Sequence, residues 1–133
     1  MTTSPVGTGV PSEVIATVNL KVTVSASQLK DLLITALEGG GSGYWCYSKV
    51  DYKYVDSKEE AMYDITHPNY KISVTDTEVG KDHSVNLGRL KVGLGDMSRK
   101  YPWHARDFVS GTWDATTSDV FLQCALFGQV RYG

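Results

Sequence analysis

The chain has 133 residues, of which 41% are hydrophobic and 21% are charged, and its net charge is −2. This length fits one domain that buries about two thirds of its unfolded surface without a disulfide or a metal. The charge argues against a broadly basic nucleic-acid binder and against an acidic mimic of DNA. Residues 1–12 are rich in Thr, Ser, Gly and Pro, so we expect a flexible arm there, ahead of a single domain over 13–133.

The location that we expect is the cytoplasm. No apolar run approaches the ~20 residues of a membrane span, so we expect no membrane partner. The first eleven residues also lack the charged-then-apolar order of a signal peptide.

The first element that we expect is a long strand over residues 13–24. Apolar and polar side chains alternate there, and successive side chains of a strand point to opposite faces. The alternation predicts one buried face, formed by Val14, Ala16, Val18, Leu20, Val22 and Val24.

A helix should follow this strand and pack on it. Ser25 and Gln28 have the spacing of a capping box. The glycine run 39–41 should end the helix, because glycine adopts the left-handed conformation readily. The apolar stripe has helical spacing and consists of Leu29, Leu32, Leu33, Ala36 and Leu37.

The middle of the chain predicts two more strands. Residues 44–55 form an aromatic-rich strand, and residues 70–75 alternate again, with Tyr70, Ile72 and Val74 on one face. Between them, residues 58–64 are either a short helix or a broad loop.

The last third is predicted to be mostly helical. Helical spacing runs from Leu87 to Tyr101, and Pro102 should open a second helix that Gly111 closes. We expect the final helix over 119–127, capped by one of residues 116–118 and ended by Gly128, with a short edge strand over 129–132. The predicted fold class is therefore α+β, with a small antiparallel or mixed sheet of three to five strands packed against helices.

The sequence holds no pattern that is typical of catalysis or of metal binding. Two cysteines and three histidines lack metal-ligand spacing, and we expect the cysteines to be buried thiols. The glycine loop 39–43 follows a helix C-terminus, whereas phosphate loops precede a helix N-terminus. We therefore expect no enzyme activity, no cofactor and no metal.

Aromatic and basic residues are the candidates for binding. Five aromatic side chains crowd the second predicted strand, where they form either a second core layer or an interface or base-stacking surface. Between Lys81 and Arg106 lie six basic and two acidic residues, a net charge of +4 in a chain of −2. A solvated helix face explains these charges as well as phosphate contacts do. The aromatic residues are Tyr44, Trp45, Tyr47, Tyr52 and Tyr54.

Two stretches of the chain resemble small phage- and prophage-encoded proteins without an assigned activity. The first is Asp31 to Gly40, with Tyr44-Trp45 following it. The second combines Lys100-Tyr101-Pro102 with Asp119 to Gly128 and the final Tyr132-Gly133. The resemblance covers about a third of the chain, carries over no site residue, and implies an accessory phage protein acting in a host cell, with interference in host defence as a role.

Two functions of different classes are expected from these features. The first is the non-catalytic binding of a small nucleotide or a nucleotide-derived signal, through stacking and phosphate contacts. The alternative is a protein–protein inhibitor of a host factor or a structural interaction module. We find no strong case for DNA or RNA as a partner, and expect a homo-oligomer, because one thin domain covers so many rings poorly. The predicted ligand-binding residues are Tyr44, Trp45, Arg89, Arg99, Trp103, Arg106 and Trp113.

Overall fold

The computed structural model describes residues 13–18, 20–52 and 58–133. Within them lie five helices and three strands, an α+β fold with a helical C-terminal part, as predicted. The predicted arm 1–12 and the aromatic residue Tyr54 lie outside the described residues. The elements are α1 (Ala26–Leu37), β1 (Cys46–Val50), α2 (Lys58–Tyr63), β2 (Ile72–Asp76), β3 (Lys81–Val85), α3 (Leu87–Lys100), α4 (Pro102–Ser110) and α5 (Ala115–Phe127).

The sheet is antiparallel, with β2 between β1 and β3. Its register places Val74 beside Ser48 on one side and beside His83 on the other. All five residues of β2 are buried, so the alternation expected for this strand is not seen in its burial. The reason is its position, since a central strand is covered by its neighbours as well as by the core.

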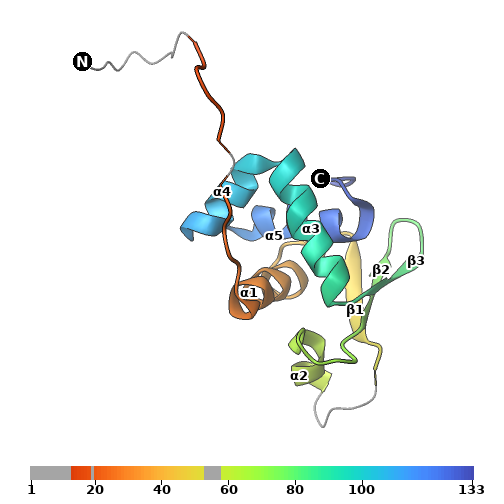
Figure 1. The fold of residues 1–133 in the computed structure, drawn as a ribbon. Coiled ribbons are helices and arrows are strands. Elements are labelled where there is room, and N and C mark those ends of the chain that lie inside the picture. The colour runs from red at the N-terminus through yellow and green to blue at the C-terminus, as the bar shows by residue number, and fades with distance from the viewer. Residues whose placement is uncertain (1–12, 19, 53–57) are drawn as a thin grey trace.

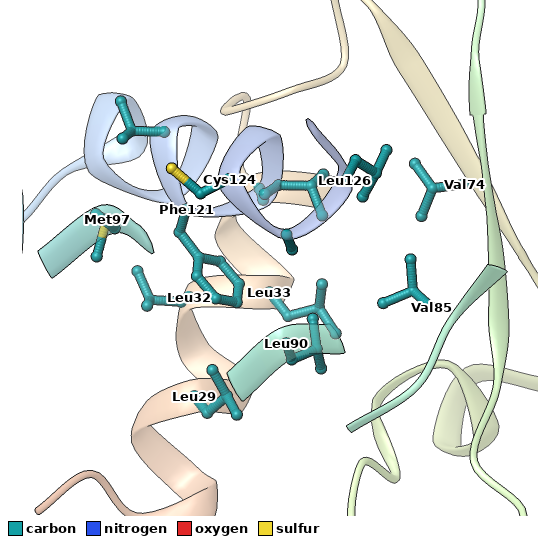
Figure 2. Close-up of a cluster of buried hydrophobic side chains, with 14 of the residues drawn as sticks. Leu29, Leu32, Leu33, Val74, Val85, Leu90, Met97, Phe121, Cys124 and Leu126 are labelled. Carbon is teal, nitrogen blue, oxygen red and sulfur yellow. The ribbon is translucent and has the colours of Figure 1, made fainter. Parts of the chain in front are cut away.

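Helix α5 is the centre of the molecule. It contacts α1, α3, α4 and β3, and its residues from Thr117 to Leu126 are all buried. Figure 2 shows Phe121 pointing from α5 toward Leu32 and Leu33 of α1, with Leu90 of α3 beside them. The apolar stripe of α1 therefore packs on a helix, and the prediction that it packs on residues 13–24 is wrong.

Helix ends follow the local chemistry of the chain. The capping box of α1 is confirmed, because the Ser25 hydroxyl accepts from the Gln28 amide at 3.1 Å and the Gln28 side chain accepts from the Ser25 amide at 2.8 Å. Pro102 opens α4 and Gly111 ends it, as predicted. Helix α5 begins four residues earlier than predicted, because Asp114 caps it by accepting the amides of residues 116 and 117.

The largest departure from the sequence prediction is the segment 13–25. Its described residues form no strand, and all of them are exposed. Each predicted inward-facing side chain is therefore solvent-exposed: Val14, Ala16, Val18, Leu20, Val22 and Val24. In Figure 1 this segment leaves the body beyond α1. The physical reason is the lack of a partner, since β1 and β3 pair only with β2 among the described residues.

Three smaller predictions about strands are also corrected. The aromatic strand predicted over residues 44–55 is shortened to β1. Trp45 lies in the turn before β1 and is buried, whereas Tyr47 lies within β1 and is exposed. Strand β3 was not predicted, although the turn at Gly80 joins it to β2. Residues 129–132 are irregular instead of an edge strand.

Candidate functional site

The loop between α1 and β1 is held against α5 by a close approach at Gly41. A Cβ atom at this position would lie 2.5 Å from Ser118 Oγ and 2.9 Å from Ala36 Cα. Only glycine fits without displacing α1 or α5. The glycine run therefore ends α1, as predicted, and also brings the next residues of the loop to the side of α5.

These loop residues converge on Asp119, a buried carboxylate of α5. Ser42 Oγ and Trp45 Nε1 each donate to Asp119 Oδ1 at 2.8 Å, and the Tyr44 hydroxyl donates to Oδ2 at 2.6 Å. Gln123, one turn further along α5, donates to Oδ2 at 3.1 Å. These four donors satisfy the Asp119 carboxylate with hydrogen bonds, and none of them is a cation.

The network continues into the C-terminal tail. Gln123 Oε1 accepts the amides of Arg131 and Tyr132 at 2.7 and 2.8 Å. The Tyr132 hydroxyl donates to the buried Asp76 of β2 at 2.6 Å. The tail, α5 and β2 are therefore connected through side chains that have their partners within the chain.

The surroundings of the network keep the Cys46 thiol and the Tyr44 phenol protonated. Burial, together with the charges of Asp119 and Asp76, raises the pKa of the Cys46 thiol to about 12. Burial and the hydrogen bond to Asp119 raise the pKa of Tyr44 to about 12. A protonated thiol is a poor nucleophile, so the arrangement is suited to structural support.

A second cluster surrounds His83 on β3. Its imidazole lies edge-on to the Phe127 ring, with centroids 5.4 Å apart. The Arg131 guanidinium lies over the same Phe127 ring, 4.0 Å from its centroid. Lys81 is two residues before His83 and therefore shares its face of the sheet. His83 Nε2 is buried and has no hydrogen-bond partner among the described residues.

Cations dominate the surroundings of His83. Burial lowers the pKa of His83, and the charges of Lys81, Arg89 and Arg131 lower it further, while Asp76 opposes them. The three cations are exposed, and the lowered pKa leaves the imidazole neutral at pH 7. His83 Nε2 lacks a hydrogen-bond partner among the described residues, and three cations act on the same imidazole. Together these groups favour the binding of an anion.

The seven predicted ligand-binding residues are distributed over separate parts of the structure. Tyr44 and Trp45 hold Asp119. Arg89 and Arg99 lie ten residues apart on α3, a rise of about 15 Å, and Arg99 forms an ion pair with Asp96.

The other three predicted residues belong to the region of α4. Trp103 is half-exposed, with Tyr101 and His104 as its ring neighbours, and Arg106 is exposed on the same helix. Trp113 packs edge-on to Phe108. Sequence reasoning missed His83, Lys81 and Arg131 as site residues, because only the fold brings the β3 strand and the C-terminal tail together.

An apolar groove lies where the segment 13–25 meets the body. It has a volume of about 570 Å³ and none of the seven predicted residues lines it. Leu20, Val22 and Val24 line one side of the groove. Helices α1, α3 and α4 and the loop between α2 and β2 line the rest, with Leu29, Phe108 and Ile65 among the residues.

No group of three or more His, Cys, Asp or Glu side chains in the described part of the chain is placed to hold a metal ion. Of the helices in that part, none is long and apolar enough to cross a membrane. Comparison with protein-family models, with curated proteins and with solved structures found no match to the chain.

Proposed function

We propose that the protein is a non-catalytic binder of a small phosphate-bearing ligand, such as a nucleotide, at the His83 cluster. The observation that carries this proposal is the enclosed, unpartnered imidazole nitrogen of His83 beside the arginine that covers Phe127. Arginine forks match phosphate oxygens, and lysine adds a point charge. The proposal keeps the ligand class that the sequence indicates but retains only Arg89 of its predicted residues.

Two further features support capture of the ligand over turnover. Burial raises the pKa of both thiols, of Cys46 to about 12 and of Cys124 to about 11, so neither is activated as a nucleophile. The Asp119 carboxylate is fully engaged by donors from its own chain. Capture without turnover also suits the accessory anti-defence role that the resemblance to phage proteins implies.

Calorimetry of the full chain tests this proposal. The titrants are inorganic phosphate, pyrophosphate and a panel of mono-, di- and cyclic nucleotides, and at least one should bind tighter than about 100 μM. Arg131→Ala and Lys81→Ala should each weaken that binding about tenfold, the loss of one charged hydrogen bond. Arg106→Ala, an exposed arginine of α4, is the matched control and should leave the affinity unchanged.

Three outcomes would contradict the proposal. Binding of no titrant would remove the phosphate-bearing class of ligands. Binding that depends on Arg106 and not on Arg131 or Lys81 would place the ligand at α4, near Trp103. Chromatography of the mixture would reveal any conversion of the nucleotide to a product, and such conversion would show that the protein is an enzyme.

A second candidate function, a protein–protein inhibitor or structural interaction module, is supported by a different surface. The segment 13–25 exposes large apolar side chains, among them Ile15, Val18 and Leu20. Soluble monomers rarely expose such contiguous apolar surface unless it binds a partner. The double variant V18S/L20S should abolish binding to a protein partner and leave nucleotide affinity within about twofold, because the two surfaces share no residue.

A further inference from the structure

The segment 13–25 has the sequence of a strand but not its hydrogen bonds. Within the described residues, no backbone hydrogen bond joins positions 13–18 or 20–24 to the rest of the chain. Val14 is 79% exposed, Ile15 is 93% exposed and Leu20 is 82% exposed. An extended segment with free N–H and C=O groups is a template for another strand.

The apolar face of this segment is oriented toward the apolar groove of the same chain. Leu20, Val22 and Val24 line the apolar groove, and these are positions of the same parity, as on one face of a strand. The exposed fraction falls from 82% at Leu20 through 54% at Val22 to 37% at Val24, where the segment meets α1. The apolar face is therefore turned toward the groove, and it lacks a covering layer before residue 22.

The two charges of the segment indicate what pairs with it. Glu13 and Lys21 are eight residues apart, and neither takes part in an ion pair among the described residues. If two copies pair antiparallel about Thr17, Glu13 of each copy lies opposite the partner's Lys21. A parallel pair in register would instead place like charges side by side, which is unfavourable.

The same register matches the apolar positions. Pairing about Thr17 sets Val14 opposite the partner's Leu20 and Ala16 opposite the partner's Val18, so apolar residues meet on one face. A shift by one residue would set apolar side chains opposite polar ones. A shift of the centre to residue 16 or 18 keeps the faces but separates Glu13 from Lys21 of the other copy.

We propose that two copies of this chain form a dimer through residues 13–21, paired antiparallel about Thr17, with their shared apolar face turned toward the grooves. Each copy then brings its Val14 beside Leu20 of the other, at the edge of the groove. Symmetric self-complementary pairing is the commonest form of assembly. The dimer is independent of phosphate binding, and it gives the structural-module function its partner.

Charge exchange between the two ends of the segment tests the register. Light scattering of the full chain should give about twice the chain mass of 14.6 kDa. Glu13→Lys and Lys21→Glu should each raise the dimer dissociation constant at least about tenfold, because like charges then face each other. The double variant E13K/K21E should restore dimerisation, and an equal mixture of the two single variants should form mixed dimers in preference to either homodimer.

A cysteine at the symmetry axis gives a second, covalent readout. Under mild oxidation, Thr17→Cys should form a disulfide-linked dimer, because its two copies lie directly opposite each other. Thr23→Cys, exposed and outside the paired residues, is the matched control and should stay unlinked. The native Cys46 and Cys124 are buried.

Two outcomes would overturn the inference. A monomer at millimolar concentration would exclude the dimer, while the nucleotide titration would still decide the phosphate proposal on its own. A dimer that ignores both charge exchanges and whose T17C form does not cross-link would assemble through another surface.

Discussion

Helix α5 and the segment 13–25 are both rich in apolar side chains, and only the helix buries them. Phe121 and Leu122 in α5 are fully buried, whereas Val18 and Leu20 in the segment are exposed. The difference lies in their neighbours, since α5 contacts four other elements and the segment precedes all of them in the chain. A hydrophobic pattern indicates which face of an element is stabilised by burial. The topology of the chain determines whether other elements of the same chain lie against that face.

The two regions therefore contribute to the free energy of unfolding in different ways. One contribution comes from contacts within a single chain, and the other depends on contacts with a second copy of the chain. The side chains around α5 are covered by α1 and α3, so their contribution does not vary with protein concentration. In the proposed dimer, residues 13–21 are covered by the second copy, so their contribution follows mass action.

The largest expected effect comes from truncating Leu33, the α1 side chain that faces Phe121 in Figure 2. Leu33→Ala should lower the free energy of unfolding by about 2–5 kcal/mol at every protein concentration, because it leaves a cavity in the core. Leu20→Ser should lower it only at concentrations where the dimer forms. Chemical denaturation at two concentrations, followed by tryptophan fluorescence, measures both, and a loss below about 0.5 kcal/mol for Leu33→Ala would contradict the packing of α1 on α5.

Asp119 gives the next largest expected effect. In Asp119→Asn the new amide group meets donors from Tyr44 and Gln123, so buried donors lose their acceptor and stability falls by about 3 kcal/mol. Asp114→Asn in the same helix is the matched control and should change stability by less than about 0.5 kcal/mol, since asparagine caps helices equally well. Equal losses in thermal unfolding of the two variants would argue against the network as a support of the loop.

The contact between α3 and α5 predicts opposite signs for two glycines of α3. A Cβ atom at Gly93 would lie 2.8 Å from both Cα and Cβ of Ala125, so Gly93→Ala should destabilise by about 1–3 kcal/mol. At Gly95 the nearest atom is the flexible end of Arg99 at 3.5 Å, so Gly95→Ala should stabilise by about 0.5–1 kcal/mol. Denaturant midpoints of the two variants on the same side of the wild type would contradict the close approach of the helices.

The smallest expected effect is a pH dependence at the C-terminal end of α5, where the His83 imidazole packs on the Phe127 ring. Because its folded-state pKa is lowered, the unfolded chain binds the proton more readily. Its contribution to stability is therefore complete above about pH 6.5 and is lost as the pH falls toward the folded-state pKa. The groups that face the imidazole are Lys81, Asp76, Arg89 and Arg131.

An NMR titration of the His83 ring measures this pKa directly. A bound phosphate should raise it, because an anion favours the charged imidazole. His83→Gln should flatten stability between pH 7 and pH 5. An unchanged His83 pKa in the presence of a ligand that binds would place that ligand elsewhere.

Local chemistry made most of the helical part of the fold predictable from the sequence. The capping box at Ser25, the proline at position 102 and the glycine at position 111 act within a few residues and are found where the sequence indicates. The partner of residues 13–25 was not predictable, because alternation carries no information on what lies opposite. Strand β3 was missed because its residues are polar and mostly exposed, a pattern that resembles a loop.

The candidate site was less predictable than the fold. Arg89 was predicted as a ligand residue from charge density, but Lys81 and Arg131 join it only through the β3 strand and the tail that Gln123 fixes. Trp45 was predicted at a binding surface, yet its indole donates to Asp119 inside the core. The sequence signal for that role is the pair Asp119 and Gln123, two polar residues one turn apart beside the apolar run of α5.

Amide hydrogen exchange at two protein concentrations tests most directly whether the segment needs a second chain. Amides of α5 should be protected at both low micromolar and millimolar concentration, since their hydrogen bonds lie in the core. Amides of residues 14–18, 20 and 21 should exchange freely in the dilute sample and become protected, in the alternating pattern of an antiparallel strand pair, in the concentrated one. Free exchange at both concentrations would contradict the pairing, and protection at both would show that the segment finds its cover within its own chain.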